Sequence, residues 1–218
     1  ARDRLLWCLP LVGLEIGLVW WALGLVCRYF GLTQAVTALV LCGAPYFLTG
    51  FLHLDGFMDV TDAVKSYRDL ERRREILKDS HVGSFAVIGC VLLILAQFAF
   101  CVSFNLKTDL RMLIVIPVIS RCCSALAVNG LPKMTTSQYA RKKVRPADIW
   151  IPLLFLAAAL TFGFLLRFRC GLVLVVELAA YALALLRSYR SLKGMNGDIS
   201  GYCLTIGELA ALGALAIL

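Results

Sequence analysis

The chain has 218 residues, of which 61% are hydrophobic and 17% are charged, and its mean hydropathy is +0.83. An ordinary soluble domain has about 45–50% apolar and about 25% charged residues, so this composition excludes a disordered chain and most soluble enzymes. The formal net charge of +8 would suggest nucleic acid for a soluble protein. In a membrane protein, the distribution of basic residues instead indicates which loops face the cytoplasm. We therefore expect a lipid bilayer as partner, and no nucleic acid.

Seven apolar stretches follow one another along the chain. A helix needs roughly 20 residues to cross a bilayer, and within lipid it satisfies its own backbone polar groups. The stretches cover residues 5–27, 34–52, 83–104, 112–128, 149–166, 170–186 and 202–218. We predict an all-α polytopic membrane bundle with about seven transmembrane helices, in a single membrane-embedded domain over residues 1–218.

Basic residues are concentrated on one side of the predicted membrane. Alternate loops carry 16 Lys and Arg on one side and 5 on the other, and such an excess marks the cytoplasmic side. With seven spans, the N-terminus would lie on the cytoplasmic side of the cytoplasmic (inner) membrane and the C-terminus on the opposite side. We interpret the longest polar stretch, 59–80, as a short cytoplasmic amphipathic helix, in which Arg72, Arg73 and Arg74 would meet anionic headgroups or phosphates.

Three aspartates stand directly after the second predicted span. Asp55, Asp59 and Asp62 are spaced by four and then three residues, so on a helix their carboxylates share one face. Like charges on one face repel, which favours a bound cation, and carboxylate oxygens suit Mg²⁺ or Mn²⁺ rather than Zn²⁺. The basic surroundings suggest that such an ion would bridge phosphates in a phosphoryl transfer. The alternative is a helix that enters water with solvated acids.

Two flanking groups have open roles. His53 is either a general base or a group that orients a carboxylate. Residues 78–85 contain Lys78, Asp79 and Ser80. Asp79 either returns to the metal as a fourth carboxylate or, together with Ser80, caps the next span.

Charged and glycine-rich positions near the later spans add further candidates. The loop at 194–201, with Gly197 and Asp198, is either a turn between spans or a loop that brings a carboxylate to the same site. Arg121 lies within a span, where a charge is costly and points at a cavity or a partner. Glu177 and Glu208 raise the same question, and for Glu177 we expect interhelical pairing or an edge position.

These segments together resemble the cobalamin synthase (adenosylcobinamide-GDP ribazoletransferase) family. The matching pieces are TGFLHLDGFMDVTDA at 49–63, EILKDSHVGSFAVI at 75–88, ISRC at 119–122, GMNGDISGY at 194–202 and the pair Gly207-Glu208. The chain departs from the usual family pattern at Phe51, Ala63 and Lys193, where relatives usually carry glycine, and at Asn196, where they usually carry threonine. We also expect a family N-terminal segment to be missing before the first span.

The resemblance implies a Mg²⁺-dependent enzyme that completes the nucleotide loop of adenosylcobalamin. A ribose hydroxyl of α-ribazole, or of its phosphate, would attack the cobinamide-linked phosphorus of adenosylcobinamide-GDP, and GMP would leave. We expect His53 and Asp79 to be catalytic, and the metal to be shared by Asp55, Asp59, Asp62 and Asp79. Substrate groups would be held by Lys78, Ser80, Arg121, Gly197 and Asp198. A homo-oligomer, or association with other corrinoid-assembly enzymes, is also expected.

Other functions remain open from the residues alone. A membrane phosphotransferase that moves a CDP-linked lipid headgroup also uses clustered aspartates, but its usual motif has an Ala-Arg pair that is absent after Asp55-Gly56. A divalent-cation transporter would need acids near mid-membrane on several helices. Glu15, Glu177 and Glu208 are candidates for that, but the main acidic cluster lies at the boundary. A purely structural membrane subunit is the third alternative.

Overall fold

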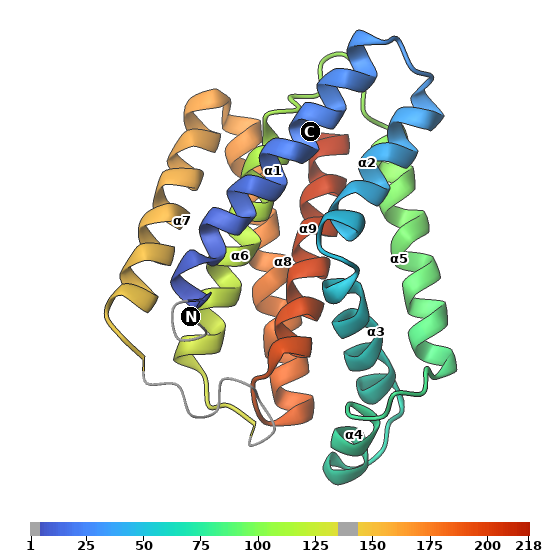
Figure 1. The fold of residues 1–218 in the computed structure, drawn as a ribbon, viewed down its shortest axis with the longest axis vertical. Coiled ribbons are helices and arrows are strands. Elements are labelled where there is room, and N and C mark those ends of the chain that lie inside the picture. Colours follow the sequence, from blue (N-terminus) through green and yellow to red (C-terminus); the bar gives the residue numbers. More distant parts are fainter. Residues whose placement is uncertain (1–4, 135–143) are drawn as a thin grey trace.

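The computed structural model describes residues 5–134 and 144–218, which are almost entirely helical. Figure 1 shows the helices side by side along one long axis. In these two ranges the helices are α1 (Leu5–Tyr29), α2 (Gln34–Leu48), α3 (Leu52–Lys65), α4 (Leu70–Ile76), α5 (Ser84–Val102), α6 (Met112–Gly130), α7 (Ala147–Leu166), α8 (Phe168–Leu192) and α9 (Gly197–Ile217).

Most of these helices match membrane spans in length and composition. Within the described ranges, α1, α5, α6, α7, α8 and α9 are long and apolar enough to cross a bilayer, and the pair α2 and α3 makes a seventh candidate. The predicted polytopic helical bundle with about seven spans is confirmed. The chain is a multi-pass membrane protein.

The second span is broken rather than continuous. The predicted span at 34–52 is not one continuous helix, because α2 ends at Leu48 and meets α3 at an 87° bend. Between them, Gly50 and Phe51 have positive φ angles of 57° and 61°, which a right-handed helix cannot contain. The predicted single amphipathic helix over 59–80 is also wrong, since these residues are divided between the end of α3 and the separate α4.

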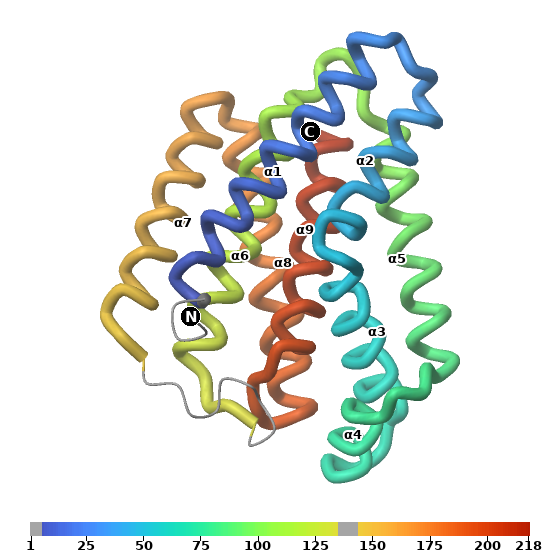
Figure 2. The backbone as a smooth tube through the Cα atoms, viewed as in Figure 1, coloured from blue at the N-terminus to red at the C-terminus, as the bar shows by residue number. Residues whose placement is uncertain are grey.

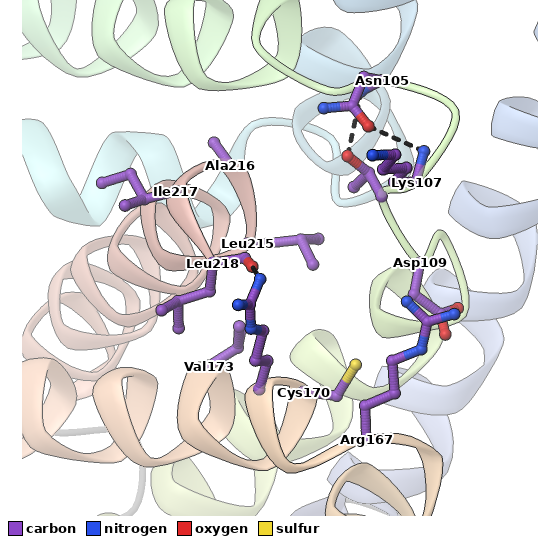
Figure 3. Close-up of a pocket in the computed structure, with 12 residues that line it drawn as sticks. Asn105, Lys107, Asp109, Arg167, Cys170, Val173, Leu215, Ala216, Ile217 and Leu218 are labelled. Carbon is purple, nitrogen blue, oxygen red and sulfur yellow. Dashed lines mark hydrogen bonds between the residues drawn. The ribbon is translucent and has the colours of Figure 1, made fainter.

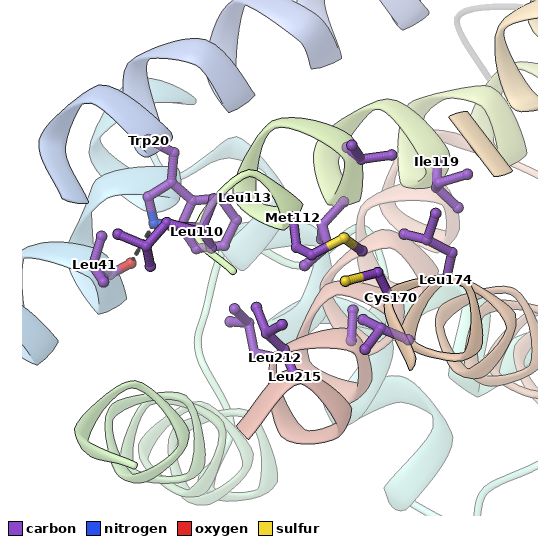
Figure 4. Packing of buried hydrophobic residues seen from close by; sticks show 14 of the residues in the cluster. Trp20, Leu41, Leu110, Met112, Leu113, Ile119, Cys170, Leu174, Leu212 and Leu215 are labelled. Carbon is purple, nitrogen blue, oxygen red and sulfur yellow. Dashed lines mark hydrogen bonds between the residues drawn. The ribbon is translucent and has the colours of Figure 1, made fainter. Parts of the chain in front are cut away.

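Helix α6 forms the centre of the bundle, and 83% of the residues in its apolar stretch are buried. It packs against α1, α7, α8 and α9. Figure 4 shows the core that results, with Trp20, Met112, Leu174 and Leu212 fully buried. The Trp20 indole N–H donates to the Leu41 carbonyl at 2.8 Å, so this large ring is buried with its polar atom satisfied.

The close crossing of α1 over α6 depends on two glycines. A Cβ at Gly17 would collide with the Ile114 carbonyl, and one at Gly13 with the Pro117 carbonyl. Small residues allow such backbone approach in membrane bundles.

We expect Gly17→Ala to lower the free energy of unfolding by about 1–3 kcal/mol, measured by denaturation in detergent. Ala22→Leu, at an exposed position of the same helix, should melt like wild type. Equal stability of Gly17→Ala and wild type would contradict this packing.

One end of the bundle gathers the polar connections. In Figures 1 and 2, α4 lies at the same end as the last turn of α3 and the first turn of α9, and α9 finishes at the opposite end. Arg74 ties α4 to the end of α8, because its guanidinium donates to the carbonyls of Leu192 at 3.0 Å and Lys193 at 2.9 Å. The loops with the basic excess, where they are described, lie at this polar end.

Candidate active site

Four carboxylates gather on the faces of α3 and α9. Asp55, Asp59 and Asp62 lie on one helix with the predicted spacing. Helix α3 packs on α9, and a Cβ at Gly56 would come within 3.0 Å of the Asp198 backbone. This close contact brings Asp198 alongside, and the charges of Asp55, Asp198 and Asp62 all act on Asp59. We call these four aspartates the acidic face.

The acidic face suits a hydrated dication by the chemistry of its donors. Its carboxylate oxygens are the ligands that Mg²⁺ prefers. Among the described residues, no three His, Cys, Asp or Glu side chains form a ready-made metal shell. Mg²⁺ does not need one, because it usually keeps several waters and takes one or two carboxylates together with substrate phosphates. A magnesium ion at this face stays a prediction.

The structure does not bring Asp79 into the acidic face. Its exposed carboxylate accepts hydrogen bonds from His81, at 2.7 Å from Nδ1 and at 3.0 Å from the backbone N–H. These hydrogen bonds lower the pKa of Asp79 and raise the pKa of His81. Asp79 and Ser80 do not cap α5 either, since its N-cap is Gly83, without a side-chain bond. The same turn does border the acidic face, because Gly83 packs against the Asp62 carboxylate.

Four of the predicted site residues line one cavity of about 190 Å³, which we call the inner pocket. Its polar lining includes His53, Arg121, Gly197 and Asp198. Leu6, Leu9, Leu52 and Leu204 contribute apolar walls. Residues predicted separately from three segments therefore meet, because α1, α3, α6 and α9 all border this space.

His53 is held in the inner pocket by its backbone. A Cβ at Gly201 would lie 3.3 Å from His53 Cα, and the Thr205 hydroxyl donates to the His53 carbonyl at 3.4 Å. The imidazole makes no hydrogen bond to a carboxylate in the described part of the chain. Its charged neighbour is Arg121. The structure thus shows no support for a role in orienting a carboxylate.

Arg121 is anchored inside the bundle by Glu208. The guanidinium forms an ion pair with the Glu208 carboxylate on α9, to which the Ser120 hydroxyl also donates at 2.8 Å. Glu177 on α8 is fully buried nearby, and neither of its oxygens finds a hydrogen-bond partner of normal geometry in the described residues. The expected edge position of Glu177 is wrong because the residue is fully buried, but the charge of Arg121 on α6 acts on it across the helix interface. Arg121 has both a partner and a cavity.

A second cavity, of about 520 Å³, opens at the polar end of the bundle. We call it the basic pocket, and its charged lining is Arg74, Lys78, Lys133, Lys193 and Asp198. Lys78 and Asp198 were predicted from the sequence as site residues, whereas Lys133 and Lys193, which follow α6 and α8, were not. Asp198 lines both cavities and belongs to the acidic face, so the acidic face, the inner pocket and the basic pocket share one residue.

A third cavity lies at the opposite end of the bundle and contains none of the predicted site residues. Figure 3 shows Arg167, Asp109 and Lys107 around it, beside the last residues of α9. Arg111 donates two side-chain hydrogen bonds to Asp109, and these lower the pKa of that carboxylate. With its one described acid already paired, this cavity does not combine an acidic face with free cations.

Comparison with known proteins places the chain in a family. The profile of cobalamin-5-phosphate synthase matches residues 1–216. The chain belongs to the cobalamin-5-phosphate synthase family. An adenosylcobinamide-GDP ribazoletransferase from Clostridium perfringens strain SM101 is 35% identical, covering 100% of this chain and 89% of the relative. Relatives of the same name from Clostridium botulinum strain Alaska E43 and Geobacillus thermodenitrificans strain NG80-2 are 32% and 33% identical, over 94% and 96% of this chain and 83% and 84% of their own lengths. No solved structure matches.

Family membership confirms the resemblance carried by the motifs at 49–63 and 75–88. Two departures from the family's usual glycines fall at left-handed backbone positions, since φ is 61° at Phe51 and 50° at Lys193. A residue with a Cβ costs about 1–2 kcal/mol in that conformation, which explains a preference for glycine there. Ala63, the third departure, is buried in the ordinary helical backbone of α3.

Proposed function

We propose that this chain transfers the phosphocobinamide group of adenosylcobinamide-GDP to α-ribazole or α-ribazole phosphate and releases GMP. A ribose hydroxyl oxygen bonds to the cobinamide-linked phosphorus, the bond from that phosphorus to the GMP oxygen breaks, and the hydroxyl proton passes to a base. Family membership over nearly the whole chain supports this reaction. The observation that carries it is Asp198, which joins the acidic face to both cavities.

The acidic face is assigned to a Mg²⁺ ion and the phosphates. One or two carboxylates of the set Asp55, Asp59, Asp62 and Asp198 would hold the hydrated ion, which would neutralise phosphate charge when bound. Asp79 receives no part in this group because its carboxylate is occupied by His81 in an exposed turn. Ser80 is exposed in the same turn and is likewise left without a role. Lys78 and Gly197 remain in the substrate site, since each lines one of the two cavities.

The inner pocket supplies a base and a cation for the acceptor. His53 has imidazole nitrogens that are not engaged by described residues, and a neutral imidazole nitrogen can accept a proton. Arg121 lines the same cavity and is fixed there by Glu208. We assign the uptake of the hydroxyl proton to His53 and the orientation of a polar or anionic acceptor group to Arg121.

The active site is assigned to the cytoplasmic face of the inner membrane. The acidic face and the basic pocket share the polar end of the bundle, and the described loops of the side predicted to carry the basic excess lie at this end. That charge excess favours the cytoplasmic side. Association with a second copy or with other corrinoid-assembly enzymes stays a prediction.

Release of GMP by the purified protein tests the proposed function. In detergent, GMP should appear only when adenosylcobinamide-GDP, α-ribazole and Mg²⁺ are all present. A CDP-linked lipid headgroup donor should give no product, and proteoliposomes should show no flux of divalent cations. Absence of GMP release from folded protein, or turnover of the CDP-linked donor instead, would overturn the assignment.

A further inference from the structure

The basic pocket is built from three segments that are far apart in the sequence. Lys78 follows α4, Lys133 follows α6, and Lys193 is the left-handed C-cap of α8. Two backbone hydrogen bonds join the last two segments, from the Met134 N–H to the Met195 carbonyl at 3.0 Å and from the Met195 N–H to the Pro132 carbonyl at 2.9 Å. The lysines therefore stand on connected backbone rather than on independent loops.

Buried apolar side chains fix the backbone beside each lysine. Leu77, Met134, Leu192 and Met195 are at most 6% exposed and belong to one cluster. Leu77 precedes Lys78, Met134 follows Lys133, and Leu192 precedes Lys193. The Arg74 guanidinium completes the frame through its two bonds to the carbonyls at the end of α8. The backbone that carries the lysines is thus fixed around the cavity before any ligand arrives.

The charge of the basic pocket is not balanced by its own residues. Lys78, Lys133 and Lys193 form no ion pair within the described ranges. Asp198 is the one carboxylate among the described lining residues, and it already accepts from the Asn196 amide at 2.6 Å. The first turn of α9 adds the partial positive charge of a helix N-terminus. Four cationic side chains against one engaged carboxylate favour a polyanion.

We propose that the basic pocket binds the nucleotide end of the donor, with Lys78, Lys133 and Lys193 around the phosphate that leaves with GMP. This inference rests on the proposed function and adds Lys133 and Lys193 as substrate-binding residues. The reacting phosphorus then lies toward Asp198 and the acidic face, while the reacting hydroxyl of the acceptor is directed to His53 in the inner pocket. A cavity of about 520 Å³ is in the range of about 300–1,000 Å³ that is usual for small-molecule ligands.

The double variant Lys133→Gln with Lys193→Gln tests this inference. We expect KM for adenosylcobinamide-GDP and the inhibition constant of GMP to rise at least about tenfold each, the change that the loss of charge-assisted hydrogen bonds produces. KM for α-ribazole should stay near wild type. Lys65→Gln removes an exposed positive charge from α3 outside the pocket and should change neither constant. Unchanged GMP inhibition in an active double variant would overturn the inference.

A binding readout separates this inference from the proposed function. GMP should raise the melting temperature of the wild type in detergent and should not raise that of the double variant. If the wild type released no GMP from the two substrates, the proposed function would fail instead. If the variant lost stabilisation by phosphatidylglycerol micelles but kept stabilisation by GMP, the pocket would hold a lipid headgroup and the inference would be wrong.

Lys193→Gly provides a second test that does not depend on correct folding of the double variant. Glycine relieves the positive φ of 50° at this position, so this variant should melt higher than wild type. It should nevertheless show weaker GMP inhibition, because the charge is gone. A more stable variant with wild-type GMP affinity would exclude Lys193 from the binding site.

Discussion

Asp59→Asn is expected to lower kcat for GMP release by at least about 100-fold, the loss typical of a group that supports a metal or a developing charge. Asp59 is the carboxylate on which the charges of Asp55, Asp62 and Asp198 all act. An amide has the same shape but no charge, so it cannot hold a dication in the same way. Because the change also removes like-charge repulsion, the melting temperature should stay equal or rise. Steady-state assays with saturating Mg²⁺ and thermal denaturation in detergent measure both quantities.

Two carboxylates at the same end of the bundle serve as controls. Glu71→Gln alters an exposed acid in the first turn of α4, and Asp79→Asn alters the acid bound to His81. Both variants should turn over close to the wild-type rate. An equal loss in Asp79→Asn and Asp59→Asn would show that the turn at 78–81 rearranges, and that Asp79 joins the α3 aspartates as predicted from the sequence.

Glu208→Ala is expected to reduce the free energy of unfolding by about 3–5 kcal/mol, the usual result of leaving a buried charge without its partner. Arg121 is 2% exposed, and its guanidinium is paired with Glu208 between α6 and α9. Denaturation in detergent measures this loss. Activity should fall as well, because Arg121 would lose the contact that holds it at the inner pocket.

Glu177→Gln is the matched control for the Arg121–Glu208 pair. Glu177 is just as buried, but its oxygens make no hydrogen bond of normal geometry to described residues, so an amide of the same shape removes no hydrogen bond. We expect its stability to equal or exceed that of wild type. A large destabilisation in Glu177→Gln, together with a mild effect of Glu208→Ala, would reverse the assignment of the counter-ion to Arg121.

Much of the fold was predictable because a segment that crosses lipid must be apolar and helical over about 20 residues. Uncharged stretches such as 83–104 must be helical, and their lengths place α5, α6 and the later spans within a few residues. The break at 49–51 was not predicted, since hydropathy carries no information about backbone dihedral angles. Gly50 indicated a left-handed position in the sequence. Phe51 gave no such indication, because a bulky residue rarely adopts a positive φ.

The site was predictable only where its residues lie on one helix. The spacing of Asp55, Asp59 and Asp62 placed them together because helical periodicity is local. Asp79 follows them closely in the sequence, yet a hydrogen bond to its own turn holds it away. Asp198 joins them through the packing of α3 on α9, a tertiary contact that no local pattern encodes. The grouping of Lys133 with Lys193 depends in the same way on the backbone bridge between their loops.

A double-mutant cycle on kcat/KM tests most directly whether the aspartates of α3 and α9 act as one site. Residues that act as a unit show strongly non-additive losses. Asp59→Asn and Asp198→Asn should each reduce kcat/KM severely, and the double variant should lose little more than the worse single variant. If the two losses multiplied in the double variant, the two carboxylates would act independently and the account of a shared site would be contradicted.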